Sequence, residues 1–191
     1  MRDIKILKIT DCESSKFLQP KSIFYTQNGV EKRWDYIKSH DSASCILYHT
    51  QKDAFLLVKQ FRPAVFINNE GSDGFTYEMC AGILDKNLTP IETIKEEIFE
   101  ECGYEVEVKN IKKVTSYISS VGITGSHQNI FFTKIDESMK KSEGGGTDDE
   151  CIELFFLPKS KIFDFINDES KSKTPGVLFS LLWYLKNEAN L

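Results

Sequence analysis

The sequence predicts an α/β fold in which helices cover a mixed β-sheet and an N-terminal antiparallel strand segment stands apart from it. An Asn28-Gly29 pair between aromatic and apolar residues is typical of a hairpin near the N-terminus. Several later strand-like runs flank one strongly acidic segment with helical spacing. The chain closes with an apolar segment that has Pro175 in its first turn, a common start for a helix.

The expected strands are apolar and aromatic runs bounded by turn residues. The hairpin spans 22–37, and a second strand pair spans 42–61 with its turn at about 51–53. Further strands are expected over 74–82, 105–119, 129–135 and 151–158, and helices over the acidic segment and 174–189. This pattern predicts an N-terminal strand subdomain at 1–40 and a main domain at 41–191.

The composition indicates a soluble, cytoplasmic protein. Hydrophobic residues make up 40% of the chain and charged residues 28%, which allows an ordinary core. The net charge of −5 argues against a broad basic face for nucleic acid. The five cysteines show no CxxC or Cys/His spacing, so we expect reduced thiols rather than zinc. The start lacks an apolar signal stretch and no apolar run reaches membrane length, so no membrane partner is expected.

The acidic segment between Gly82 and Tyr104 poses an electrostatic problem. Like charges spaced four apart each cost a helix a few tenths of a kcal/mol, and only Lys95 offsets them here. The isoleucines of the same helix form one stripe, which we expect to face the sheet. The glutamates are Glu92, Glu96, Glu97, Glu100 and Glu101, and the isoleucines are Ile91, Ile94 and Ile98.

Two interpretations of these carboxylates are open. A charge run is most often a solvated helix face. Here, however, Glu97, Glu100 and Glu101 converge at i, i+3 and i+4 spacing beside the apolar stripe. They also lie in the C-terminal half of the helix, where the dipole disfavours negative charge. A divalent cation resolves this conflict, and oxygen ligands suit Mg²⁺, which shares its shell with phosphate oxygens. The sequence therefore predicts a magnesium site for a phosphorylated ligand.

The same segment resembles the signature box of the Nudix hydrolases. That box reads Gly, five residues, Glu, seven residues, then Arg-Glu-aliphatic-x-Glu-Glu-x-Gly-aliphatic. Two positions depart from it, because Leu88 replaces the first glutamate and Glu96 replaces the arginine that is thought to hold a metal-binding glutamate in place. The matching residues are Gly82, Glu97, Ile98, Glu100, Glu101, Gly103 and Tyr104.

Segments outside the box are similar to the UDP-sugar diphosphatase branch, a relative of the ADP-ribose pyrophosphatases. The resemblance covers about residues 30–187 and includes "LLVKQFRPAV", "SSVGITGSHQ" and "TPGVLFSLLWYL". It implies a Nudix-type α/β/α sandwich and Mg²⁺-dependent hydrolysis of UDP-glucose to UMP and glucose 1-phosphate. It also implies a homodimer in which N-terminal strands contribute to the partner's site.

The resemblance assigns roles in metal binding and catalysis. Glu97, Glu100 and Glu101 match the metal-binding box glutamates, and the carbonyl of Ala81 is expected to join them on Mg²⁺, with Mn²⁺ as a substitute. The base that deprotonates water is either a box glutamate, with Glu97 and Glu101 as candidates, or a carboxylate of the loop "KKSEGGGTDDE". In that loop Glu150 is the preferred candidate, with Asp148 and Asp149 behind it. Its three glycines are expected to let it close over substrate as a lid; a merely solvated loop is the alternative.

Further substrate contacts are expected outside the box and the glycine-rich loop. Arg62 follows an apolar strand, and a guanidinium at a strand end suits bidentate phosphate recognition; a surface ion pair is the alternative. Glu78 either orients the box or pairs with Arg62. Trp34 either stacks on uracil or lies in a dimer core.

The loop "SSVGITGSHQ" supplies the remaining candidates. Gly122 and Gly125 could let backbone amides approach the sugar or the phosphates. His127 is expected either to add a hydrogen bond to the ligand or to play a structural role.

Two alternatives to UDP-glucose hydrolysis stay open. The substrate could instead be ADP-ribose or another ADP-sugar. The chain could also be a catalytically weakened nucleotide-sugar binding protein, because Leu88 and Glu96 depart from the box.

Overall fold

A computed structural model describes residues 4–15, 18–147 and 150–188. The chain divides into two compact units. The first contains strands β1 (Gln19–Gln27) and β2 (Val30–Lys38) together with Ser119–Ser126. The second contains the large sheet and its helices. The assignment of 1–40 to dimerisation and of 41–191 to hydrolysis stays a prediction.

The first unit confirms the expected hairpin. Strands β1 and β2 pair antiparallel over their whole length, and the last ladder pair is Gln27 with Val30. Asn28 and Gly29 between them have positive φ of 53° and 77°, as a two-residue type I′ turn requires. The amide of Ile37 donates to the carbonyl of Ile123 at 2.9 Å, which ties the 119–126 segment to β2.

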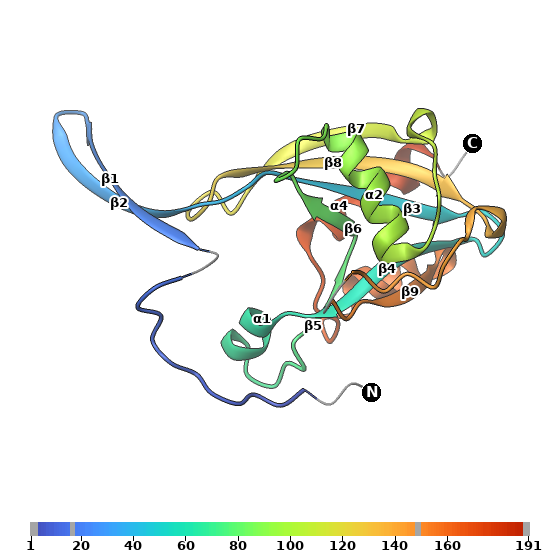
Figure 1. The fold of residues 1–191 in the computed structure, drawn as a ribbon, viewed down its shortest axis with the longest axis horizontal. Helices are drawn as coiled ribbons and strands as arrows, with labels where there is room; N and C mark the ends of the chain where they lie inside the picture. The colour runs from blue at the N-terminus through green and yellow to red at the C-terminus, as the bar shows by residue number, and fades with distance from the viewer. Residues whose placement is uncertain (1–3, 16–17, 148–149, 189–191) are drawn as a thin grey trace. The chain divides into compact units, whose positions relative to one another are not determined.

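The second unit is built on a seven-stranded mixed sheet (Figure 1). Its main path runs β5-β4-β3-β8-β7, while β6 pairs with β3 and β9 pairs with β4. The β3–β8 pair is parallel, whereas β3 pairs antiparallel with β4 and β6. The strands are β3 (Ser42–His49), β4 (Ala54–Phe61), β5 (Phe75–Glu78), β6 (Cys80–Ile83), β7 (Lys112–Ser119), β8 (Ser126–Ile135) and β9 (Glu153–Pro158).

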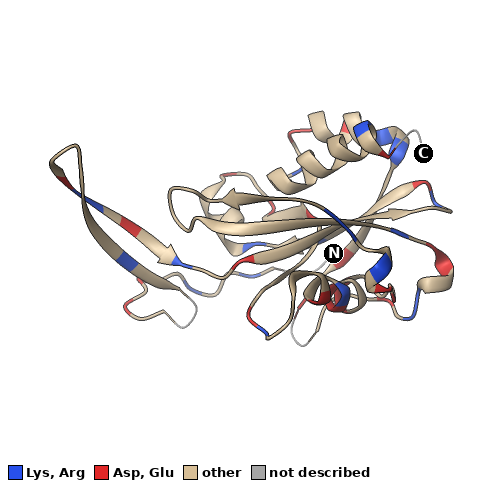
Figure 2. Ribbon diagram, turned by 90° about the horizontal axis from the view of Figure 1, so that it is seen from above, with Lys and Arg blue, Asp and Glu red and all other residues tan. Residues whose placement is uncertain are grey.

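Helices cover both faces of this sheet (Figures 1 and 2). Helix α2 (Pro90–Cys102) packs on one face, and α3 (Ile162–Asn167) and α4 (Pro175–Asn187) pack on the other. Successive residues of β3 serve the two cores in turn, since side chains alternate along a strand. Cys45 and Leu47 lie in the α2 core, whereas Ile46 and Tyr48 lie in the α4 core. The expected sandwich with a mixed sheet is confirmed.

The structure differs from the sequence prediction in its short elements. The single strand expected over 74–82 is two strands, because β5 pairs with β4 and β6 pairs with β3 on either side of Met79. A strand pattern shows extension but not this change of partner. The strand expected over 105–119 begins only at Lys112, after a 3₁₀ turn. The prediction also missed helices too short for an apolar period, namely α1 (Pro63–Asn68), α3, η1 (Val108–Asn110), η2 (Glu137–Met139) and η3 (Lys159–Lys161).

Within the described parts of the chain, no helix is both long enough and apolar enough to span a membrane.

Candidate metal and phosphate site

Helix α2 is held in place by its first turn and its apolar stripe. Thr89 caps the helix, because its hydroxyl accepts from the Glu92 amide at 3.4 Å and the Glu92 carboxylate accepts from the Thr89 amide at 2.9 Å. This is a complete capping box. Ile94 and Ile98 are fully buried against the sheet. The expected stripe is confirmed, and it brings the following glutamates to the sheet beside β6.

Glu101 is a nearly buried carboxyl group. Only 5% of the residue is exposed, and its Oε2 accepts a hydrogen bond from the amide of Ala81 at 3.0 Å. Burial raises the pKa of Glu101 to about 8, and the charges of Glu97 and Glu150 push the pKa in the same direction. The Ala81 amide and the Cys80 thiol counteract part of this rise.

Glu97 lies directly against Gly82 of strand β6. A Cβ atom added to Gly82 would sit 2.1 Å from Oε1 of Glu97, so a side chain there would displace the carboxylate. This is a physical reason for the first glycine of the box. Burial raises the pKa of Glu97 to about 7, and the negative charge of Glu100 adds to it, while Lys86 opposes it.

These carboxyl groups fit a divalent cation chemically. Two have raised pKa values because burial and like charge disfavour their ionised forms, and a dication reverses that balance. All the donors are oxygen atoms, as Mg²⁺ and similar hard ions prefer. Among the described residues, however, no three Asp, Glu, His or Cys side chains already converge as a metal site. One oxygen of Glu101 is taken by the Ala81 amide instead. The full ligand set of Glu97, Glu100, Glu101 and Ala81 stays a prediction.

Arg62 and Glu78 form a bidentate ion pair beside these carboxyl groups. Nε and Nη2 of Arg62 donate to the two carboxylate oxygens of Glu78, both at 2.7 Å. The hydrogen bond to Glu78 raises the pKa of Arg62, and the charges of Glu101 and Glu150 add to the effect. The expected pairing of Glu78 with Arg62 is therefore present. It fixes the guanidinium at the end of β4 in the neighbourhood of the carboxylates.

The glycine-rich segment lies against the C-terminal end of α2. The amides of Gly145 and Gly146 donate to the carbonyls of Glu101 and Glu100, at 2.8 and 3.1 Å. The carboxylate of Glu150 accepts from the Thr147 amide at 3.1 Å. The charge of Glu150 acts on Glu97, Glu101 and Arg62, which places it near them. The alternative candidates Asp148 and Asp149 lie outside the described residues.

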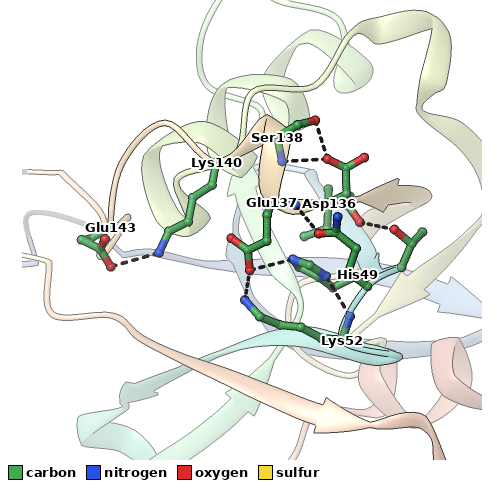
Figure 3. Close-up of polar contacts among 10 residues, drawn as sticks. His49, Lys52, Asp136, Glu137, Ser138, Lys140 and Glu143 are labelled. Atoms are coloured by element: carbon green, nitrogen blue, oxygen red, sulfur yellow. Dashed lines mark hydrogen bonds and ion pairs between the residues drawn. The ribbon is translucent and has the colours of Figure 1, made fainter.

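A polar network anchors the chain that leads into this segment (Figure 3). Glu137 pairs with Lys52, and its Oε1 lies 3.3 Å from Nε2 of the buried His49. Asp136 caps the short helix η2 by accepting from the Ser138 amide at 2.8 Å. The sequence offered no sign of this role for His49, because an isolated histidine carries no spacing pattern.

The other expected substrate residues are not brought to the carboxylates by any described contact. Trp34 and Gly122 belong to the first unit, where the indole Nε1 donates to the Gly122 carbonyl at 3.0 Å. Gly125, with φ of 61°, belongs to the same unit. Trp34 lines an apolar groove of about 580 Å³ with residues such as Ile23. His127 belongs to the second unit, where its amide donates to Asp41 at 2.7 Å.

Sequence reasoning missed Lys86 as a member of this site. Its Nζ lies 3.0 Å from Oε2 of Glu96. The bond to Glu96 raises the pKa of Lys86, and the charges of Glu100 and Glu97 contribute. A lysine in the loop before a helix looks like any solvated residue, so the only available signal was the acid at position 96 that lacked a partner.

Comparisons with known proteins agree with this fold. A NUDIX domain model matches residues 38–174. The chain is 35% identical to the uridine diphosphate glucose pyrophosphatase of Bos taurus, over 96% of this chain and 95% of the relative. It is 38% identical to the GDP-mannose pyrophosphatase of Pectobacterium atrosepticum, over 67% and 64%. A solved structure of an ADP compounds hydrolase superposes with a TM-score of 0.72 at 16% identity, covering 98% of this chain and 96% of that one.

The α/β/α sandwich with its acidic helix defines a Nudix-type domain. The chain belongs to the NUDIX family, as the box predicted. Members of this family generally use divalent metal ions.

Proposed function

We propose that this chain hydrolyses the diphosphate of a nucleoside diphosphate sugar, with UDP-glucose as substrate and UMP and glucose 1-phosphate as products. The observation that carries the proposal is the 35% identity to a UDP-glucose pyrophosphatase over nearly the whole of both chains. The buried Glu101, the half-buried Glu97 and Glu100, and the Arg62–Glu78 pair supply the chemistry that a diphosphate needs.

The proposed cofactor is Mg²⁺, with Mn²⁺ as a substitute. Glu97, Glu100, Glu101 and the Ala81 carbonyl would hold it. When bound, it supplies charge neutralisation for the diphosphate oxygens. Because protonated carboxyl groups bind metal poorly, Glu97 and Glu101 must lose their protons first.

The chain's own residues act on the water and on the diphosphate. Glu150 accepts a proton from the attacking water, whose oxygen forms a bond to one phosphorus atom. The bond between that phosphorus and the bridging oxygen breaks, and the electron pair stays on the bridging oxygen of the departing phosphate. Arg62, held by Glu78, binds the non-bridging oxygens whose negative charge grows during this step.

The remaining roles belong to the same proposal. Trp34 stacks on the uracil, Gly122 and Gly125 offer backbone amides to the sugar or the phosphates, and His127 adds a hydrogen bond. The protein acts as a cytoplasmic homodimer in which the N-terminal strands complete the partner's site.

A substrate panel tests this proposal. UDP-glucose, ADP-ribose and GDP-mannose are incubated with the chain and Mg²⁺, and a phosphatase then releases phosphate only from the monoester products. We expect the largest kcat/KM with UDP-glucose. A larger kcat/KM with ADP-ribose would mean that the chain acts on ADP-sugars. A larger kcat/KM with GDP-mannose would mean that it acts on the substrate named for the bacterial relatives.

A binding protein with weakened catalysis is the second candidate, motivated by Leu88 and Glu96. The Lys86–Glu96 pair argues against it, because a cation lies beside the acids even though the box arginine is missing. Calorimetry with UDP-glucose, run beside the turnover assay, separates the two. Binding without any product in Mg²⁺ or Mn²⁺ would favour the second candidate.

A further inference from the structure

The C-terminal end of α2 is completed by a distant part of the chain. The last carbonyls of a helix lack partners within the helix. In α2, which is described throughout, the amide of Gly103 donates to the carbonyls of Ile98 and Phe99, and the last turn contains no basic residue. The carbonyls of Glu100 and Glu101 instead accept hydrogen bonds from the amides of Gly146 and Gly145, respectively. The residues whose side chains are the proposed metal ligands are thus bonded through their backbones to the glycine-rich segment.

Only glycine fits this arrangement. Gly144, Gly145 and Gly146 have positive φ of 66°, 108° and 87°, a region that other residues rarely adopt. A Cβ atom at Gly144 would lie 2.4 Å from the carbonyl oxygen of Glu101. A Cβ atom at Gly146 would lie 2.4 Å from Oε2 and 2.6 Å from Cβ of Glu150. The glycines therefore permit close approach to the helix on one side and to Glu150 on the other.

The segment is also fixed before and after the glycines. The amides of Lys141 and Ser142 donate to the Gly103 carbonyl at 2.8 and 3.2 Å. Beyond the glycines, the amide of Ile152 returns to the Gly145 carbonyl at 3.2 Å. A lid needs backbone that is free to swing, whereas this backbone is hydrogen-bonded to the last turn of α2 and to Gly103.

We propose that Gly144–Gly146 is a positioning hook that fixes Glu150 relative to the metal-binding turn of α2. This inference rests on the proposed function, in which Glu150 accepts the proton of water. The hook acts through Glu150 and does not touch the substrate. The bonds of Gly145 and Gly146 to α2, and of the Thr147 amide to the Glu150 carboxylate, set the place of this base before substrate arrives.

The first test is Gly146→Ala, which forces Glu150 to move, with Gly144→Ala as a second variant that pushes the segment off the helix. We expect kcat for UDP-glucose to fall about 10- to 100-fold, as for other residues that orient a reacting group, while KM changes less than about twofold. Gly71→Ala is the matched control, because Gly71 also has positive φ (80°) but nothing lies within 4 Å of its Cβ position. An unchanged kcat in Gly146→Ala would overturn the hook.

A double-mutant cycle with Glu150→Gln shows whether the hook works through Glu150. We expect Gly146→Ala to cause no further loss of kcat in the Glu150→Gln background. An equal loss in both backgrounds would overturn the inference, and so would a Glu150→Gln variant with full activity.

Amide hydrogen exchange separates failure of the hook from failure of the proposed function. We expect the amides of Gly145 and Gly146 to be protected in the full chain and exposed in Gly144→Ala. If the chain turns over none of the nucleotide sugars, the proposed function fails, and this exchange then decides the hook alone. Unprotected amides in the unaltered chain would overturn it.

Discussion

The two ends of α2 are built in opposite ways. At its start, Thr89, Pro90 and Glu92 complete the helix from within a few neighbouring residues. At its end, the carbonyls of Glu100 and Glu101 depend on Gly145 and Gly146 from a distant loop. The start is a local stabilising device, whereas the end joins elements that carry the proposed chemistry. Changes at the start should therefore affect stability, and changes at the end should affect activity.

The largest effect is expected at the end of the helix, in Glu101→Gln. The amide side chain keeps the shape and can still accept from the Ala81 amide, but it cannot supply a charged ligand. We expect kcat for UDP-glucose to fall about 100- to 1,000-fold, because metal charge stabilisation contributes several kcal/mol.

Thermal melting tests whether Glu101→Gln lowers activity without lowering stability. Glu101→Gln removes a carboxyl group whose ionised form is disfavoured by burial. The metal-free variant should therefore melt at the same or a higher temperature than the unaltered chain at pH 8. A large drop in melting temperature would mean that the group is structural.

The next effect concerns pH and metal. The pKa values of Glu97 and Glu101, about 7 and about 8 in the folded chain, exceed the ordinary glutamate value of 4.5. Between pH 4.5 and these raised pKa values, the folded state therefore binds more protons than the unfolded state. The free energy of unfolding of the metal-free chain should thus fall as pH rises from about 5 to 8, by an amount on the order of a few kcal/mol. Most of this comes from the nearly buried Glu101, because solvent screens the half-buried Glu97.

Denaturant titrations at several pH values check this prediction. Mg²⁺ binds the ionised carboxylates, so its stabilising effect should be larger at pH 8 than at pH 6. Glu101→Gln should flatten the pH dependence. A free energy of unfolding that rises with pH in chelator would contradict the assigned pKa shifts.

A smaller effect is expected at the start of the helix. Thr89→Ala removes the N-cap hydroxyl and should cost about 1 kcal/mol, or about 2–4 °C in melting temperature for a chain of this size. Its kcat should equal that of the unaltered chain, since the first turn lies away from the acids proposed to hold metal. A tenfold loss of kcat would remove the contrast between the two ends.

The smallest effect is expected for Glu96→Arg, which restores the box arginine. Lys86 already places a cation beside Glu96, and both side chains are largely exposed. The rate should therefore change by less than about fivefold, the range typical of exposed ion pairs. A gain well above tenfold would instead support a decayed enzyme.

The same contrast explains what the sequence could and could not predict. The hairpin turn at Asn28-Gly29, the isoleucine stripe and the box glutamates were readable because each depends on neighbours within one turn or one strand. The pairing of Arg62 with Glu78 was one of two alternatives, since a strand end limits the available partners. The glycines at 144–146 were noticed, but their attachment to α2 was not, because it joins segments far apart in the chain. The cation at Lys86 was missed because a lysine in the loop before a helix looks like any solvated residue.

The buried cysteines allow the separation of α2 from the sheet to be measured chemically. Cys45, Cys80 and Cys102 lie fully buried between the sheet and α2, and burial raises the thiol pKa of Cys45 and Cys80. Cys12 and Cys151 are exposed. An alkylating reagent should therefore modify the exposed pair at once and the core thiols only when the helix separates from the sheet. The rate of that slower modification measures how often α2 detaches from the sheet, without any label added to the chain.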